Sequence, residues 1–262
     1  MYRTNETDLS YYYLEKIFNE NKLDAVLIGG WATYLLVNEE FKKRNGFNYI
    51  GSRDIDIGFR LEPEWNENRL RKSEFASALN VLKHLGFIPV SFRQQICFDY
   101  DTLKILTDAD LINKPEFEIF RLYVDVVVNV IPDSFEKTFG FIPIDEPLLD
   151  LSFYHGKEDY VYIDDVRIRT VKPEVLLAMK FNSTPNRTKD DKMLKDISDI
   201  YAIAWYSSKK FDKLKQELYK FYSKKKVRKV VSSITDSQYN RVSEFLTISK
   251  EEIVTVISNL SK

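Results

Sequence analysis

The sequence predicts an α+β fold, with residues 1–170 combining strands and helices and residues 171–262 forming an all-helical C-terminal domain. Two observations support this division. Up to residue 170, short apolar runs and period-two alternations, both typical of strands, stand between helical patterns. From Pro173 onward only helical spacings recur. Because no low-complexity linker marks the junction, we expect a change of structural class there rather than a flexible tether.

The elements of the first 170 residues follow from local patterns. Residues 25–28 form a continuous apolar run, typical of a buried strand, and end at two glycines. Residues 54–59 alternate between Asp or Gly and large apolar side chains, which is the period of a strand. Residues 117–131 carry the strongest strand signal because Val and Ile dominate their second half. We therefore expect, in chain order, a helix over 8–22, a strand over 25–28, a helix over 31–37, a polar loop over 39–52 that carries Lys42, Lys43 and Arg44, a strand over 54–59, a helix over 68–85, strands over 87–98 and 117–131, and a hairpin over 160–170.

The C-terminal residues predict helices. Pro173 fits the first position of a helix, where its missing N–H needs no partner, and this helix reaches residue 182. A second helix covers 189–206, and three more helical patterns follow. Between Lys209 and Lys229 ten basic residues stand against two acidic ones, with aromatic residues among them. Such a segment suits RNA, through stacking and phosphate contacts, or an amphipathic helix with its aromatics in the core; we favour the second.

Composition excludes several classes of protein. No apolar run approaches the roughly 18–20 residues needed to cross a bilayer, so no membrane partner is expected, and residues 1–21 lack the apolar stretch of a signal peptide. Cys97, the one cysteine, lies in an apolar run and predicts a buried thiol, and its solitude suits a reducing, cytoplasmic location. His84 and His155 stand apart and show no metal-ligand spacing. No Ser or Cys lies in a nucleophile-elbow context.

Three aspartates predict a cation site. Asp54 and Asp56 lie two apart on a strand, so both carboxylates point to one side and repel each other unless a cation lies between them. Asp125 is the one charge in the otherwise apolar run over residues 123–128, where an unpaired charge is costly. Mg²⁺ prefers such oxygen ligands together with substrate phosphates. If the two strands are neighbours, we expect the three carboxylates to converge on one or two ions, about 3.5–4 Å apart.

Each feature has a simpler explanation when it stands alone. An Asp-x-Asp pair is a common accident, and Asp125 could lie on a solvated face. Gly29 and Gly30, at a strand end that opens a helix, could form an ordinary tight turn or bring backbone N–H groups close to phosphates. The three features together favour the phosphate-handling interpretation.

These motifs resemble the polymerase-beta-type nucleotidyltransferase superfamily. The resemblance rests on Gly29-Gly30-Trp31-Ala32, Ser52-Arg53-Asp54-Ile55-Asp56-Ile57 and Val124-Asp125-Val126. Within the superfamily, the chain looks most like the abortive-infection type IV toxin nucleotidyltransferases and the antibiotic nucleotidyltransferases. The former also have a Lys on one C-terminal helix and a Lys-Asp-x-x-Asp run on the next, similar to Lys180 and to Lys195-Asp196-Ile197-Ser198-Asp199 here. The match spans roughly residues 26–206 but consists of short motifs, and the 23 residues between Gly30 and Asp54 are more than is usual.

The resemblance implies a mixed β-sheet flanked by helices and an enzyme that moves a nucleoside monophosphate from a nucleoside triphosphate to an acceptor, releasing pyrophosphate. Asp54, Asp56 and Asp125 would be the catalytic and metal-binding residues, with two Mg²⁺ ions that Mn²⁺ can replace. It also implies an acceptor that is tRNA, a protein or a small molecule, and a toxin role with an antitoxin partner. The alternative is a catalytically weak nucleotide- or RNA-binding module with the same fold.

The implied substrate-binding residues are Gly29, Gly30, Ser52, Arg53, Lys180 and Lys195. The glycines and Ser52 would cradle phosphate. Arg53 could be a phosphate ligand or a surface charge. Lys180 and Lys195 would reach the triphosphate or the acceptor, although an exposed helix face is the usual place for lysine.

Overall fold

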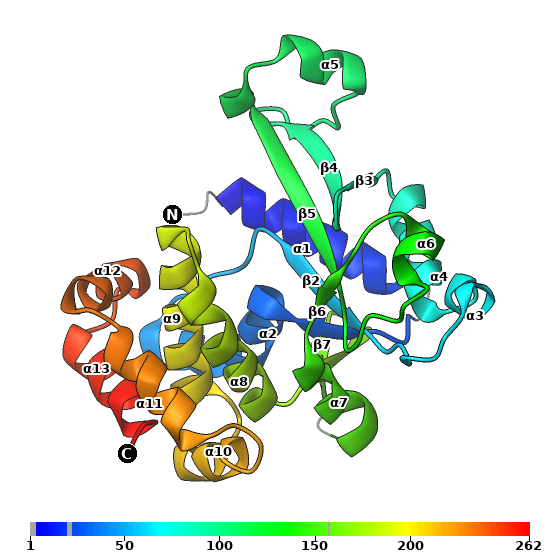
Figure 1. Cartoon of the computed structure of the whole chain (residues 1–262). Helices are drawn as coiled ribbons and strands as arrows, with labels where there is room; N and C mark the ends of the chain where they lie inside the picture. The colour runs from blue at the N-terminus through cyan, green and yellow to red at the C-terminus, as the bar shows by residue number, and fades with distance from the viewer. Residues whose placement is uncertain (1–3, 20–22, 157) are drawn as a thin grey trace.

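A mixed β-sheet of eight strands lies at the centre of the fold, in a computed structural model that describes residues 4–19, 23–156 and 158–262 (Figure 1). Its central strands are parallel in two pairs, β5 with β2 and β1 with β8, while β2 and β1 are antiparallel. The short β6 (Ile144–Asp145) runs parallel to β5. Across the sheet the order is β3 (Ile88–Val90), β4 (Arg93–Asp99), β5 (Ile119–Val128), β2 (Ile55–Phe59), β1 (Val26–Ile28), β8 (Val166–Val171) and β7 (Glu158–Ile163).

The central position of β2 and β5 follows from their residues. The apolar side chains of β2 are fully buried, and the residues of the second half of β5, from Val124 to Val128, are all buried as well. Because both faces of these strands are covered, their sequences are apolar wherever no chemistry is required. The predicted strands at 25–28, 54–59 and 117–131 and the hairpin over 160–170 are confirmed. The α+β fold class is confirmed as well.

Helices pack against the sheet, and the C-terminal helices form a group beside it (Figure 1). α2 (Gly29–Asn45) leaves β1 directly, and α9 (Asp190–Tyr206) packs against both α2 and α8 (Pro173–Ser183). α1 (Thr4–Asn19) contacts β5 and β8. The remaining helices of the first half are α3 (Glu67–Arg71), α4 (Glu74–His84), α5 (Asp108–Asn113), α6 (Phe135–Phe139) and α7 (Asp150–His155), and those of the second half are α10 (Phe211–Leu218), α11 (Lys224–Ser233), α12 (Asp236–Leu246) and α13 (Lys250–Asn259). One hydrophobic core includes residues from both halves, and the boundary near residue 170 stays a prediction.

The predicted loop over 39–52 is wrong in its first half, because α2 continues to Asn45. Phe41 holds this extension: its buried ring packs edge-on against Tyr49 and Tyr206. Gly46 then ends the helix in a left-handed conformation with φ 81°. The basic residues at 42–44 therefore occupy the last turn of a helix, where positive charge is favourable.

Other boundaries also differ from the predictions. The helix expected over 68–85 is two helices, because Ser73 accepts a hydrogen bond from the Ala76 N–H and starts α4 anew. The strand expected over 87–98 is a hairpin that turns at Ser91, whose φ is 56°. Four helices, not three, follow α9 in the described residues.

The basic segment 209–229 packs as an amphipathic structure, as favoured. Leu214, Leu218 and Tyr222 of this segment are buried, and Tyr222 stacks on Phe181 of α8. Cys97 is buried as expected. Of the described helices, none combines the length and the apolar character that crossing a membrane requires.

Candidate active site

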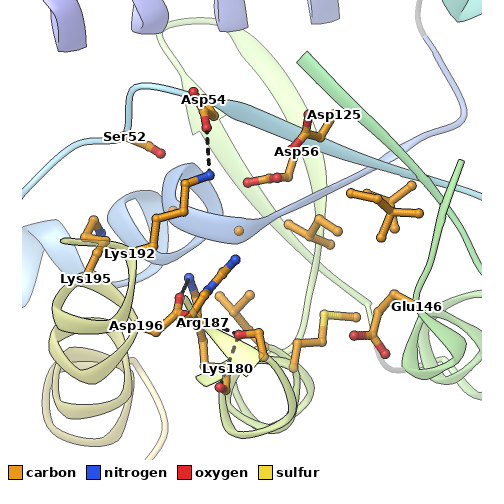
Figure 2. Close-up of a pocket in the computed structure, with 18 residues that line it drawn as sticks. Ser52, Asp54, Asp56, Asp125, Glu146, Lys180, Arg187, Lys192, Lys195 and Asp196 are labelled. Atoms are coloured by element: carbon orange, nitrogen blue, oxygen red, sulfur yellow. Dashed lines mark hydrogen bonds and ion pairs between the residues drawn. The ribbon is translucent and has the colours of Figure 1, made fainter. Parts of the chain in front are cut away.

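A cavity of about 240 Å³ lies between the sheet and the helices α8 and α9 (Figure 2). The start of α2 forms its floor with Gly29 and Gly30, and Ser52 lies beside them. Carboxylates come mainly from the sheet side, whereas the cations come from α8, α9 and the segment between them. The charged residues that line it are Asp54, Asp56, Asp125, Glu146, Lys180, Arg187, Lys192, Lys195 and Asp196.

The register of β2 and β5 brings the predicted aspartates together. Asp56 and Asp125 are paired positions on these parallel neighbours, so both side chains leave the same face of the sheet. Asp54, two residues before Asp56, borders the same cavity (Figure 2). The expectation that the two strands are neighbours is confirmed.

The environment of Asp56 disfavours its ionised form. Desolvation raises the pKa of Asp56 to about 7, and the nearby charges of Asp125 and Asp54 add to this shift. Lys180 and Lys192 act in the opposite direction. A carboxyl group whose charge is suppressed by burial and by like charges gains most from a further cation.

The turn at Gly29 and Gly30 packs closely against Asp56 and Ser52. Gly29 has a φ of 70°, and a Cβ at this position would overlap Asp56 Oδ2 and lie 2.7 Å from Asp56 Cγ. A Cβ on Gly30 would lie 2.6 Å from Ser52 Oγ. The chain leaves along α2 and returns to Ser52, so the long separation between the motifs does not keep them apart. α2 begins without a side-chain cap on Ile28, which leaves the first-turn N–H groups at its positive end for another acceptor.

Arg93, which the sequence analysis missed, holds two of the three aspartates. Its Nε lies 2.5 Å from Asp125 Oδ1, and its Nη2 lies 2.9 Å from Asp125 Oδ2 and 3.0 Å from Asp54 Oδ2. Arg93 begins β4, directly across from Asp125, and its guanidinium lies over the Tyr123 ring. Burial raises the pKa of Asp125, and Arg93 counteracts this shift. The hairpin turn at Ser91 creates this pairing, whereas the sequence pattern predicts one continuous strand there.

The predicted convergence of the three carboxylates on a metal ion is not seen in this arrangement. Among the described residues, no group of three His, Cys, Asp or Glu side chains is positioned to hold a metal ion. The guanidinium of Arg93 takes the place between Asp54 and Asp125 instead. Mg²⁺ therefore stays a prediction.

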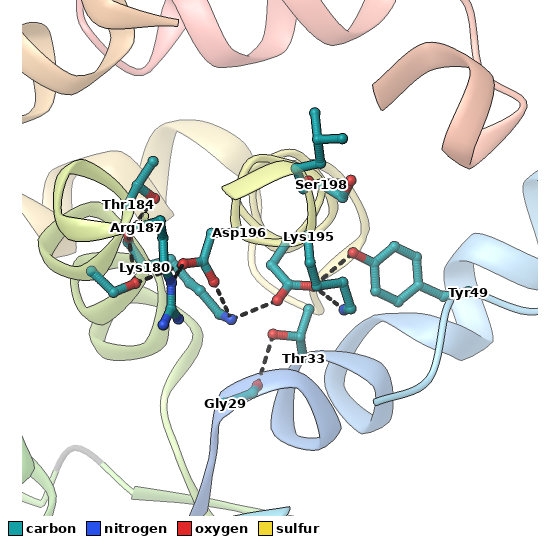
Figure 3. Close-up of polar contacts among 12 residues, drawn as sticks. Gly29, Thr33, Tyr49, Lys180, Thr184, Arg187, Lys195, Asp196 and Ser198 are labelled. Carbon is teal, nitrogen blue, oxygen red and sulfur yellow. Dashed lines mark hydrogen bonds and ion pairs between the residues drawn. The ribbon is translucent and has the colours of Figure 1, made fainter. Parts of the chain in front are cut away.

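Lys180 and Lys195 are buried in an ion-pair network rather than exposed on helix faces (Figure 3). Lys180 Nζ lies 2.8 Å from Asp196 Oδ1 and 2.6 Å from Asp199 Oδ2, and Lys195 Nζ lies 2.5 Å from Asp199 Oδ1. Tyr49 Oη donates to Asp199 Oδ1 at 2.8 Å. Burial opposes the charge of Lys180, but the two aspartates outweigh it and raise its pKa. Both lysines border the cavity while compensating the charge of buried aspartates.

Two further cations complete the wall of the cavity. Lys192 Nζ lies 3.5 Å from Asp54 Oδ2, and its side chain is 39% exposed. It lies three residues before Lys195 on α9, so helical periodicity alone could have placed it beside the predicted Lys195. Arg187 Nε lies 2.6 Å from Asp196 Oδ2.

Arg53 does not line the cavity. Its Nε lies 3.2 Å from Glu6 Oε2, and its guanidinium lies over the Phe120 ring. These contacts favour the surface-charge alternative, and Arg53 as a phosphate ligand stays a prediction. Residue 53 precedes β2, which starts at Ile55, and its side chain extends toward Glu6 of α1 and Phe120 of β5.

No protein-family model and no curated protein match the chain. Among solved structures, it is similar to an antigenic nucleotidyltransferase-like protein from Paracoccidioides brasiliensis, with 14% sequence identity, a TM-score of 0.47 and 94% of each chain covered. A TM-score of this size is too low to transfer a fold family or an activity. The functional interpretation therefore rests on the cavity and its residues.

Proposed function

We propose that the chain is a Mg²⁺-dependent nucleotidyltransferase that moves a nucleoside monophosphate from a nucleoside triphosphate to an acceptor hydroxyl or phosphate. One observation carries this proposal. Asp56 lies directly against the left-handed Gly29 turn at the start of α2 and is paired in register with Asp125. Carboxylates, an uncapped helix start and a wall of cations thus share one cavity. A divalent cation and a polyphosphate are the ligands that use all three.

The residues present fit a Mg²⁺ ion by their chemistry. Asp54, Asp56 and Asp125 supply hard oxygen donors, and burial raises the pKa of Asp56 and of Asp125, so a further cation would favour their ionised forms. When bound, Mg²⁺ would neutralise the negative charge that develops on the phosphate groups during transfer. Mn²⁺, which favours the same ligands, would substitute for it.

The protein groups would bind and orient the substrates. The N–H groups of the first turn of α2, opened by Gly29 and Gly30, would donate hydrogen bonds to phosphate oxygens. Lys192 would neutralise part of the triphosphate charge, because it is the most exposed cation beside Asp54. Asp125 would take the proton of the attacking hydroxyl. The hydroxyl oxygen would bond to the α-phosphorus while the bond from that phosphorus to the departing pyrophosphate breaks.

The alternative is a catalytically weak nucleotide- or RNA-binding module, and the Arg93 contacts favour it. Arg93 neutralises Asp54 and Asp125 with three hydrogen bonds, which is an arrangement that can persist without a metal ion. In this alternative the cations of α8 and α9 would still bind a polyphosphate.

Incubation with each labelled nucleoside triphosphate, Mg²⁺ or Mn²⁺, and tRNA, protein or small hydroxyl acceptors separates the two functions. Label transfer that is lost in Asp56→Asn and kept in Asp101→Asn, an exposed control, would support the enzyme. Wild type and Asp56→Asn that bind nucleotide and transfer no label to any acceptor would instead support the binding module. Labelling of tRNA would support the toxin role, which then calls for a neutralising antitoxin partner.

A further inference from the structure

α11 carries a concentrated positive charge on its outer face. Its ten residues include five basic side chains and no acidic one. The buried Val227 and Val230 attach it to the core, so the basic residues lie on the opposite face. All five are exposed: Lys224, Lys225, Lys226, Arg228 and Lys229.

Stability does not account for this charge. Basic residues three and four apart on a helix repel each other by about 0.2–0.5 kcal/mol per pair, and Lys225 has such neighbours in Arg228 and Lys229. Three lysines also occupy the first turn, where the helix dipole disfavours positive charge. The neighbouring helices α10, α12 and α13 each carry at least one acidic residue in the first turn instead. Amphipathic packing requires the two valines but not five cations outside them.

The protein leaves most of this charge uncompensated. Among the described residues, Lys225, Arg228 and Lys229 form no ion pair. Lys224 donates to the carbonyl of Lys262, and Lys226 lies 5.5 Å from the centre of the Tyr222 ring. The rest of the chain outside 209–229 carries a net charge of about −9 (−1 minus +8), so the positive surface is local.

The basic helix adjoins the wall of the cavity. α11 packs against α8, which contributes Met179, Lys180 and Ser183 to the cavity (Figure 1). Tyr222, just before α11, stacks on Phe181 with ring centres 6.3 Å apart. The charge of Glu146, another cavity residue, adds to the burial that raises the pKa of Tyr222, so these two groups are near each other. A long polyanion held on α11 can therefore extend toward the cavity.

We propose that the outer face of α11 binds the phosphate backbone of a nucleic acid. Calling this nucleic acid the acceptor rests on the proposed function, whereas the binding itself does not. An anionic membrane is the less suitable partner because a membrane-bound helix inserts an apolar face. The valines of α11 are buried in the protein, and no described residue after Trp205 is an exposed large hydrophobic.

The test measures binding of one mixed-sequence oligonucleotide, as fluorescently labelled single-stranded RNA and as DNA, in chelator and without nucleotide. The variant replaces Lys225, Arg228 and Lys229 with Gln. If each contacts one phosphate, affinity falls at least roughly tenfold at low salt, and the slope of log K against log salt falls by about 2 (three contacts at about 0.7 each). Tighter binding of RNA than of DNA would identify RNA as the source of the phosphates.

The matched control carries Lys43→Gln, Arg71→Gln and Lys137→Gln, which remove the same charge from exposed sites elsewhere. Equal affinity and salt slope in both triple variants and the wild type would overturn the proposal. So would binding of phosphatidylserine vesicles without binding of either oligonucleotide. Asp56→Asn is expected to bind the oligonucleotide as the wild type does even when transfer is lost, which separates failure of this proposal from failure of the proposed function.

Discussion

Replacing Gly29 with Ala tests whether the turn is shaped by Asp56. The substitution adds one methyl group at a residue whose φ is 70°. That methyl group would overlap Asp56 Oδ2 and crowd the rest of its carboxylate. The Asp56 carboxylate would have to move away from its position beside Asp125, its register partner on β5.

The magnitude divides into two parts. A left-handed conformation costs a residue with a Cβ about 1–2 kcal/mol. Forcing a packed neighbour to move costs a further 1–3 kcal/mol or so. We therefore expect Gly29→Ala to lower the free energy of unfolding by roughly 2–5 kcal/mol, and to lower nucleotide transfer because Asp56 is displaced.

Gly46→Ala isolates the first part. Gly46 has a φ of 81°, and a Cβ there would meet no heavy atom within 4 Å. Denaturant unfolding of both variants should show Gly29→Ala to be the less stable by about 1–3 kcal/mol. The double variant with Asp56→Ala removes the overlapping atoms, so its loss should be smaller than the sum of the single losses. Equal losses for Gly29→Ala and Gly46→Ala, with additive behaviour in the double variant, would refute the reasoning.

Three further predictions concern charged groups of the cavity. Arg93→Gln leaves the carboxylate of Asp125 without its partner and should lower the free energy of unfolding by about 2–4 kcal/mol. The control Arg121→Gln, whose partner Glu116 is largely exposed, should lower it by about 1 kcal/mol or less. Similar losses for the two variants in denaturant unfolding would contradict this prediction. Because the pKa of Asp56 is raised to about 7, the folded state binds more protons than the unfolded chain between about pH 4 and 7, so stability should fall as the pH rises through this window. Unfolding measured in chelator checks this, and an equal slope in Asp56→Asn counts against it. Lys192→Gln removes a partly exposed cation and should change stability by no more than about 0.5 kcal/mol while slowing transfer roughly tenfold or more; unchanged kinetics would exclude Lys192 from substrate binding.

The sequence was informative where local pattern and burial agree. Asp54 and Asp56 both border the cavity, as their spacing of two residues predicted, and the apolar run around Asp125 predicted a central strand. The glycine pair was placed correctly at the strand end. These features depend on residues that are neighbours in the sequence, so a single sequence is enough to predict them.

The missed features depend on how distant segments meet. Arg93 joins the site through a turn at Ser91, where a residue other than glycine adopts a left-handed conformation that no local pattern announces. The extension of α2 to Asn45 depends on Phe41 packing against Tyr206, which lies far along the chain. In both cases tertiary contacts decide the local structure, and propensity is the weaker influence.

Residues from both halves of the chain line the cavity. The sheet contributes carboxylates whose pKa values burial raises, and the cations near them come both from the sheet, with Arg93, and from the helices α8 and α9. Lys192 of α9 approaches Asp54, and Lys180 and Lys195 reach the cavity while they hold Asp196 and Asp199 in the interior. A residue that compensates a buried charge is costly to remove whether or not it touches substrate, by about 3–5 kcal/mol. Loss of activity in Lys180 or Lys195 variants would therefore report on the placement of α9 against the sheet as much as on chemistry, and the exposed Lys192 is the better probe of substrate contact.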